Sequence, residues 1–198
     1  MNKQGGLMNK CVLLSVRPQW CELIANGKKT IEVRKTRPKL ETPFKCYIYC
    51  TAPKKFYKIS EHMATSSEYL HLCNGKVTMS DGFEFFGRAD YKVLNRKVIG
   101  EFVCDAYIGW SINPLDGLYM IFPHELAAAC LTGKDFEQYG NSKTLYGWHI
   151  SALQIYDKPK ELSEFRKPIM PMGLRYEDDA IKRATQSWCY VEEYDGKR

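Results

Sequence analysis

Nine residues near the start of the chain decide the fold: Gly27-Lys28-Lys29-Thr30-Ile31-Glu32-Val33-Arg34-Lys35. A short amphipathic run, residues 18–24, precedes them; it opens with a proline and places its apolar side chains at helical spacing. Gly27 stands where the left-handed residue that ends a helix is expected. After it, polar and apolar residues alternate, which predicts a strand that buries Ile31 and Val33.

The polar face of this predicted strand carries Thr30, Glu32 and Arg34. A carboxylate two residues from a guanidinium on one strand face can pair with it, which keeps Glu32 ionised and presents Lys29 and Arg34 beside it. We therefore take Lys29 and Glu32 as candidate catalytic residues, and Lys29 and Arg34 as candidate ligand-binding residues. A purely structural ion pair is the competing interpretation, because exposed pairs are common in proteins.

The spacing of Gly27, Lys29, Glu32 and Arg34, Gly-x-Lys-x-x-Glu-x-Arg, resembles the signature of ASCH domains, which are relatives of PUA RNA-binding domains. An apolar strand over 12–16, the Ser15-Val16-Arg17-Pro18 junction and the predicted helix precede it in that order. Other segments resemble phage-type, bacterial members of the family: residues 47–51, 82–85, 97–104, 146–150 and 186–188. Together these pieces span residues 12–192.

The resemblance implies a PUA-like β-barrel with a cleft that is lined by Lys29, Glu32 and Arg34. It also implies binding of RNA or a nucleotide, which is the function that we favour. The first alternative is an amidohydrolase that acts on a modified nucleoside such as N4-acetylcytidine. ASCH proteins with that activity resemble this chain at Lys29 but carry threonine at the position of Glu32, which would have to act as a general base on water. The second alternative is a ribonuclease in which Lys29, Tyr47 and Arg34 act on the phosphate.

Positive charge is concentrated in the first third of the chain. Residues 1–60 contain 13 Lys and Arg against 3 Asp and Glu, a balance of +10, whereas the remainder contains 16 against 20, a balance of −4. This asymmetry favours an anionic partner such as nucleic acid, although a solvated lysine-rich surface has the same composition. The candidate contacts to RNA are Arg17, Lys28, Lys35, Arg37 and Lys39.

Four further segments have the period-two alternation of strands: residues 44–51, 97–105, 144–156 and 187–192. In the first of them Lys45, Tyr47 and Tyr49 share a face, which could be a base-stacking platform or ordinary packing. Glu101 lies among apolar neighbours in the second, where it belongs either to a salt bridge or to the cleft. We interpret His149, in the third, as a structural residue.

The remaining pattern predicts short helices over 123–131, with a stop at Gly133, and over 134–139. A hairpin that turns at Asp81-Gly82 is predicted within residues 75–85. Strands without a βαβ rhythm predict an α+β fold, a small, mainly antiparallel barrel with short flanking helices. We expect a flexible leader over 1–10, one domain over 11–192 with an insertion at about 53–96, and a tail over 193–198.

The eight cysteines are scattered and most lie inside apolar runs without a Cys-x-x-Cys pair, so we expect reduced core thiols. The four histidines show no ligand spacing with them, and we expect neither a metal nor a cofactor. No run approaches the roughly 18 apolar residues of a membrane span, and the first residues lack the apolar core of a signal peptide. We therefore expect a cytoplasmic protein that binds RNA, a nucleoside or a nucleotide and no membrane. The oligomeric state has no signal in the sequence.

Overall fold

The computed structural model describes residues 10–51, 77–78, 84–85, 96–169 and 178–196. Its elements in chain order are β1 (Lys10–Val16), α1 (Pro18–Ala25), β2 (Ile31–Arg34), β3 (Phe44–Cys50), β4 (Val77–Thr78), β5 (Glu84–Phe85), β6 (Lys97–Trp110), α2 (Pro123–Ala129), α3 (Gly133–Gly140), β7 (Leu145–Glu161), the 3-10 helix η2 (Leu162–Glu164) and β8 (Trp188–Glu192).

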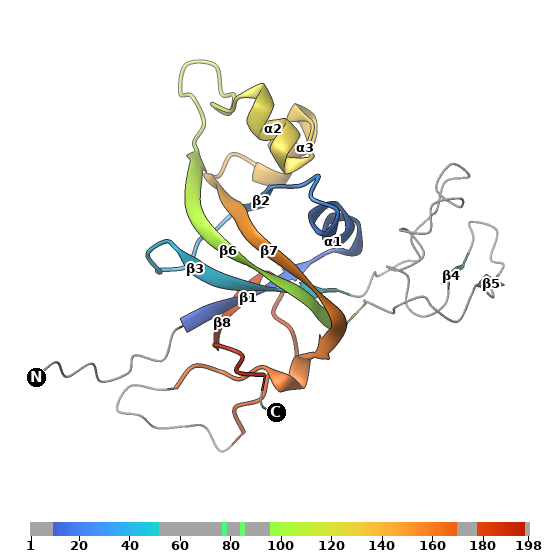
Figure 1. Cartoon of the computed structure of the whole chain (residues 1–198). Coiled ribbons are helices and arrows are strands. Elements are labelled where there is room, and N and C mark those ends of the chain that lie inside the picture. The colour runs from blue at the N-terminus through green and yellow to red at the C-terminus, as the bar shows by residue number, and fades with distance from the viewer. Residues whose placement is uncertain (1–9, 52–76, 79–83, 86–95, 170–177, 197–198) are drawn as a thin grey trace, which may run out of the picture.

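A six-stranded sheet in the order β2-β7-β6-β3-β1-β8 forms the centre of the molecule (Figure 1). Neighbouring strands are antiparallel except β1 and β3, which run parallel. The predicted α+β fold with a mainly antiparallel sheet is therefore confirmed. The edge strands β2 and β8 are not hydrogen-bonded to each other in the described part of the chain, so the sheet is not a closed barrel there.

A second, two-stranded sheet lies in the region expected to be an insertion. β4 pairs with β5 in antiparallel register, Val77 opposite Phe85. This confirms a hairpin within residues 75–85, while its predicted turn at Asp81-Gly82 and most of residues 53–96 lie outside the described residues. The domain boundaries stay a prediction.

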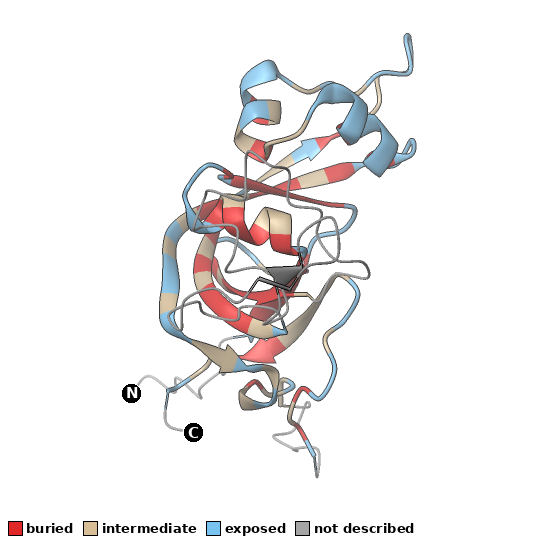
Figure 2. Ribbon diagram, turned by 90° about the vertical axis from the view of Figure 1, so that its right-hand side faces the viewer, coloured by how far each residue is buried: buried red, intermediate tan, exposed pale blue. Residues whose placement is uncertain are grey.

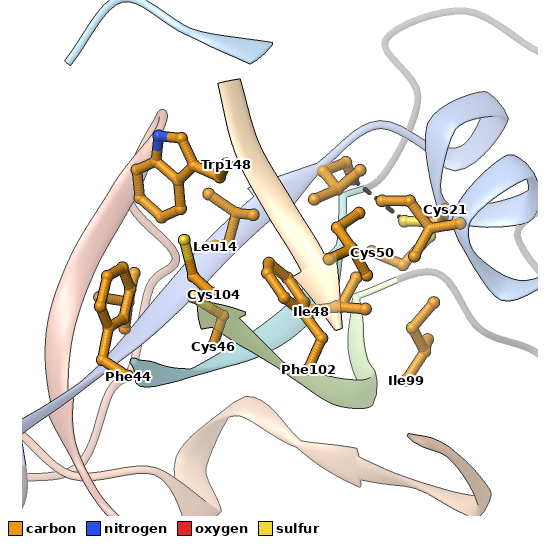
Figure 3. Close-up of a cluster of buried hydrophobic side chains, with 14 residues drawn as sticks. Leu14, Cys21, Phe44, Cys46, Ile48, Cys50, Ile99, Phe102, Cys104 and Trp148 are labelled. Carbon is orange, nitrogen blue, oxygen red and sulfur yellow. Dashed lines mark hydrogen bonds between the residues drawn. The ribbon is translucent and has the colours of Figure 1, made fainter. Parts of the chain in front are cut away.

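Apolar side chains cover both faces of the sheet. On one face, alternate residues of β1 and β3 pack with α1, Phe102 and Trp148 (Figure 3). On the other, Tyr47 and Tyr49 pack against Phe165 and other residues near the C-terminus. Figure 2 shows the buried residues concentrated along the strands and the exposed ones on the outer sides of the helices. Because both faces of the sheet are covered, alternate residues of a central strand point into two different buried clusters, and not one into the core and the next into solvent.

The helix that precedes the signature forms as predicted. Pro18 opens α1, and the chain leaves the helix through Gly27 at φ +74°, a left-handed conformation that glycine adopts without strain. The prediction for the next helix was wrong at its end. α2 stops at Ala129, because Cys130 takes the left-handed conformation, and Gly133 instead opens α3 behind Thr132, whose hydroxyl accepts from the Asp135 N–H.

Most of the described cysteines lie in the core, as the sequence predicted. Those fully buried are Cys11, Cys21, Cys46, Cys50 and Cys104. Burial raises the pKa of Cys11 to about 11 and that of Cys104 to about 12, so these thiols stay protonated and unreactive at neutral pH. Within the described ranges, no helix is both long and apolar enough to cross a membrane.

Candidate functional site

Glu32 and Arg34 of the signature lie on β2, at one edge of the sheet, and Lys29 lies just before it. β2 pairs with β7, which places Glu32 opposite Trp148 and Arg34 opposite Tyr146. Ile31 and Val33 face the other way and are buried against α2 and α3, as the alternation predicted. This rigid pairing fixes the direction of the polar side chains of β2.

Three charged side chains meet there, and we call Lys29, Glu32 and Arg34 the ion cluster. Arg34 Nη2 lies 2.9 Å from Glu32 Oε1, and Lys29 Nζ lies 3.5 Å from Glu32 Oε2. Arg34 Nη2 also donates to the carbonyl of Ser15 at 2.7 Å. The predicted pairing of Glu32 with Arg34 is therefore present, with Lys29 as a second cation on the same carboxylate.

Lys29 also joins β2 to the end of α2. Its ammonium donates to the carbonyl of Ala129, the last residue of α2, at 2.6 Å, and lies 5.0 Å from the centre of the Trp20 ring. The carbonyl end of a helix carries partial negative charge and is stabilised by a cation. Part of the charge of Lys29 is thus offset by α2, and the aromatic face of Trp20 offers a weaker contact.

The ion cluster is buried, and it holds more positive than negative charge. The side chains of Lys29, Glu32 and Arg34 are 3%, 6% and 9% exposed. Removing three charged groups from water is costly, and their mutual attraction repays this cost only when every group is well paired. Here two cations share one carboxylate, and the Nε of Arg34 is buried without a hydrogen-bond partner among the described residues. Stability alone therefore does not account for the ion cluster, and its excess positive charge suits an anion.

Tyr139 of α3 lies beside the ion cluster. Burial raises the pKa of its hydroxyl, while the positive charges of Arg34 and Arg17 act in the opposite direction. The ring remains 39% exposed, and the ammonium of Lys35 lies 5.1 Å from its centre. The ring of Tyr139 and the exposed cations Arg17 and Lys35 thus lie close to the ion cluster.

The predicted RNA contacts fall into an exposed and a buried group. The exposed residues are Arg17, Lys28, Lys35, Arg37 and Lys39, and the buried ones are Lys29, Arg34 and Tyr47. Lys35, Arg37 and Lys39 lie on one loop, residues 35–43, which continues directly from β2. The structure therefore places exposed cations immediately before and after the ion cluster along the chain.

Tyr47 was predicted wrongly as an aromatic contact for a base or a phosphate. It was assigned to the correct side of β3, but that side is covered by Phe165, and Tyr47 is 0% exposed. Its hydroxyl accepts from the Tyr194 N–H at 2.7 Å. Alternation along one strand identifies a face, but it cannot show that a segment more than 100 residues later will cover it.

Two further expectations are corrected or resolved by the same geometry. Lys29 and Arg34 were expected to be presented on the surface of a cleft, whereas both are buried within the ion cluster. Glu101 belongs to a salt bridge and not to the cluster, because its carboxylate lies 3.1 Å from Lys45 and accepts from the Tyr156 hydroxyl at 2.5 Å. His149 pairs with Asp105 at 2.6 Å.

Sequence patterns did not identify Tyr139, Trp20 and the carbonyl of Ala129 as parts of the site. Trp20 belongs to the predicted helical spacing with Leu23 and Ile24, but that spacing does not show that its ring meets Lys29. Tyr139 and Ala129 lie about 100 residues further along the chain, and their approach depends on how α2 and α3 pack against β2. No local pattern contains that information.

Comparison with known proteins supports the family suggested by the signature. The model of the ASCH domain matches residues 14–60, which include α1, the whole of β2 and the following loop. The chain contains an ASCH domain. Its ion cluster is therefore formed by the charged residues of the ASCH signature.

The fold of this ASCH domain is similar to that of the crystal structure of ASCH from Zymomonas mobilis, with 15% identity and a TM-score of 0.51 over 92% of this chain and 87% of that chain. A mutant protein of the same ASCH gives a TM-score of 0.52 at 15% identity, over 94% of this chain and 92% of that one. At this identity the likeness concerns the fold alone. No curated protein sequence matches the chain.

Proposed function

We propose that this ASCH domain binds RNA, or a nucleotide, with the phosphate held over the ion cluster. The observation that carries the proposal is the buried excess of positive charge in the ion cluster, where Lys29 and Arg34 both lie beside the carboxylate of Glu32. The ASCH resemblance points to the same ligand class.

The surroundings of the cluster fit a single-stranded nucleic acid. Phosphates are attracted by exposed Lys and Arg, and bases stack on aromatic rings whatever their sequence. Arg17 and Lys35 supply the charge close to the cluster, and the half-exposed ring of Tyr139, on α3, lies against the ammonium of Lys35. An RNA strand that runs along the loop after β2 would then meet Lys39 as well.

The charge contribution is tested by replacing Arg17, Lys28, Lys35 and Lys39 together with glutamine. All four are exposed, so the variant should melt within a few degrees of the wild type. Its affinity for an eight-nucleotide RNA should fall, and the slope of log affinity against log salt should decrease by about 3, since each lost phosphate contact removes roughly 0.7.

A matched control removes the same number of exposed charges elsewhere, at Lys134, Lys143, Lys158 and Arg183. Because net charge falls equally in both variants, a difference between them reports position and not total charge. If the control weakens RNA binding as much as the first variant does, the contact surface is not at β2.

A hydrolase remains a second candidate because Lys29 Nζ and Glu32 Oε2 are neighbours at 3.5 Å, which is the pair that such a reaction would use. Both carboxylate oxygens of Glu32 lie beside cations, Oε1 beside Arg34 and Oε2 beside Lys29. Glu32→Gln separates the candidates: a hydrolase loses turnover of N4-acetylcytidine, whereas a binder without chemistry shows no turnover in either protein.

A further inference from the structure

The loop after β2 reaches the opposite edge of the sheet; we call residues 35–43 the strap. Two side chains of β8 fasten it. Trp188 Nε1 donates to the Thr36 hydroxyl at 3.0 Å, and the Tyr190 hydroxyl accepts from the Lys39 N–H at 2.8 Å. Both hydrogen bonds are exposed, so water can compete for them and each contributes little to holding the strap.

Arg37, in the middle of the strap, lies against two aromatic rings. The carbon of its guanidinium is 5.4 Å from the centre of the Tyr107 ring and 5.9 Å from that of the Tyr146 ring. A planar cation beside two rings is held by cation–π attraction. Residues Arg37 to Glu41 also line an open hollow of about 370 Å³. Arg37 thus fills a place in which another planar group could lie against the same rings.

Two hydrogen-bond donors near this place are unused. The hydroxyl of Tyr107 and the indole N–H of Trp148 are buried and have no partner among the described residues. The two rings are in contact edge to face, with centres 5.9 Å apart. In Figure 3 the indole nitrogen of Trp148 points away from Leu14 and Ile48. Unpaired buried donors are rare because each is costly, and two of them on adjacent side chains indicate a missing acceptor.

The ion cluster and these aromatic residues lie on neighbouring strands, β2, β7 and β6. Trp148 is the register partner of Glu32 on one side and of Tyr107 on the other, and Tyr146 is the partner of Arg34. Register partners in a sheet project from the same face. A ligand with a phosphate over the ion cluster would therefore have its neighbouring groups close to the unused donors.

We propose that Tyr107, Tyr146 and Trp148 form a site for a planar heterocyclic base, and that Arg37 fills this site in the ligand-free protein. The base would accept hydrogen bonds from the Tyr107 hydroxyl and the Trp148 indole N–H with its carbonyl or ring-nitrogen atoms. Its entry displaces Arg37 with the strap, and the released guanidinium becomes available to a phosphate. This proposal rests on the proposed function, because RNA or a nucleotide supplies the base; a free nucleoside offers the same base without phosphate.

The first test is to remove the occupant. Arg37→Ala should bind at least one of cytidine, uridine, adenosine and guanosine about tenfold more tightly than the wild type in calorimetric titration, because the base no longer competes with the guanidinium. Lys143→Ala is the matched control: it removes one exposed positive charge away from the strap and should bind the four nucleosides as the wild type does. Equal nucleoside affinity in Arg37→Ala and wild type, for all four nucleosides, overturns the proposal.

The second test removes one unused donor. Tyr107→Phe keeps the ring and deletes a buried hydroxyl without a partner, so it should fold with undiminished stability. In the Arg37→Ala background it should weaken nucleoside binding about fivefold to tenfold. Unchanged affinity would mean that this hydroxyl does not face the ligand, and would overturn its assignment as a hydrogen-bond donor to the base.

These outcomes are separate from the fate of the proposed function. Nucleosides carry no phosphate, so their binding to Arg37→Ala does not depend on Arg17, Lys28, Lys35 and Lys39. Salt-dependent binding of the eight-nucleotide RNA by the wild type, together with no nucleoside binding by Arg37→Ala, overturns the base site alone. Absence of RNA binding by the wild type overturns the proposed function, whatever the nucleosides do.

Discussion

Two clusters of lysine and glutamate lie on the strands of this ASCH domain, and they differ in burial and in the sign of their charge. In the ion cluster on β2, two cations share one carboxylate and every side chain is less than 10% exposed. On β3 and β6, Lys45 instead lies 3.1 Å from each of two carboxylates, Glu101 and Glu193, with side chains 19–43% exposed. The first cluster has an excess of positive charge, and the second an excess of negative charge.

The difference is the basis for proposing a ligand at the ion cluster and none at Lys45. Water solvates the surplus carboxylate beside Lys45, so that cluster needs no further partner and contributes little to stability. The surplus cation, Lys29, is shielded from water, and the carbonyl end of α2 and the ring of Trp20 offset part of its charge. Similar residue types on the same sheet thus fit a structural role at Lys45 and the binding role that we propose for the ion cluster.

The largest expected effect comes from breaking the buried pair. Arg34→Ala should lower the free energy of unfolding by about 3 kcal/mol or more, because it leaves Glu32 with a weaker partner and the Ser15 carbonyl without its donor. Lys45→Ala, in the exposed cluster, should cost less than about 1 kcal/mol. Urea unfolding of both variants measures the difference. Equal costs would remove the distinction between the two clusters.

A smaller effect is expected at the edge of the ion cluster. Tyr139→Ala should weaken binding of an eight-nucleotide RNA by roughly tenfold, since base stacking on an aromatic ring contributes about 1–3 kcal/mol. Tyr139→Phe keeps the ring and should retain most of the affinity. Fluorescence anisotropy of labelled RNA compares the two variants, and similar losses in both would assign the role to the hydroxyl and not to stacking.

The smallest effect concerns the exposed cluster and its dependence on pH. Burial lowers the pKa of Lys45, but its hydrogen bonds to Glu193 and Glu101 outweigh burial, and the net pKa is raised above 10.5. A lysine with a raised pKa in the folded state contributes stability below its unfolded pKa and loses that contribution as pH rises through the folded pKa.

Wild type should therefore be slightly more stable than Lys45→Met at pH 7 to 9, by less than about 1 kcal/mol, and this margin should shrink above pH 10.5. Thermal unfolding of both proteins across this range checks the trend. A margin that grows with pH would show that the sign of the shift is wrong.

The sequence predicted local features of the site and missed its tertiary ones. The pairing of Glu32 with Arg34 followed from a spacing of two on one strand, and the left-handed Gly27 from its place after a helix. Both depend on neighbours within a few residues, which is the range over which period and capping rules act. The positions of most strands along the chain also followed from alternation.

The burial of individual side chains could not be predicted from local sequence patterns in the same way. Lys29 and Arg34 are charged, and a surface position was the natural expectation for them, but α2 and Ser15 supply the acceptors that allow burial. Tyr47 alternates as expected, yet Phe165 covers it. In each case the deciding contact comes from a distant segment, so only the packed structure reveals whether a patterned face is exposed.

The central claim is that the buried charge of Lys29 serves a ligand, and Lys29→Met tests it most directly. Methionine fills a similar volume and leaves Glu32 and Arg34 as a balanced pair, so the free energy of unfolding should change by no more than about 1 kcal/mol, the scale of the lost bond to Ala129. We predict that the dissociation constant for the eight-nucleotide RNA at low salt rises at least tenfold. An unchanged dissociation constant with a clear loss of stability would contradict the account and leave Lys29 as a cap for α2.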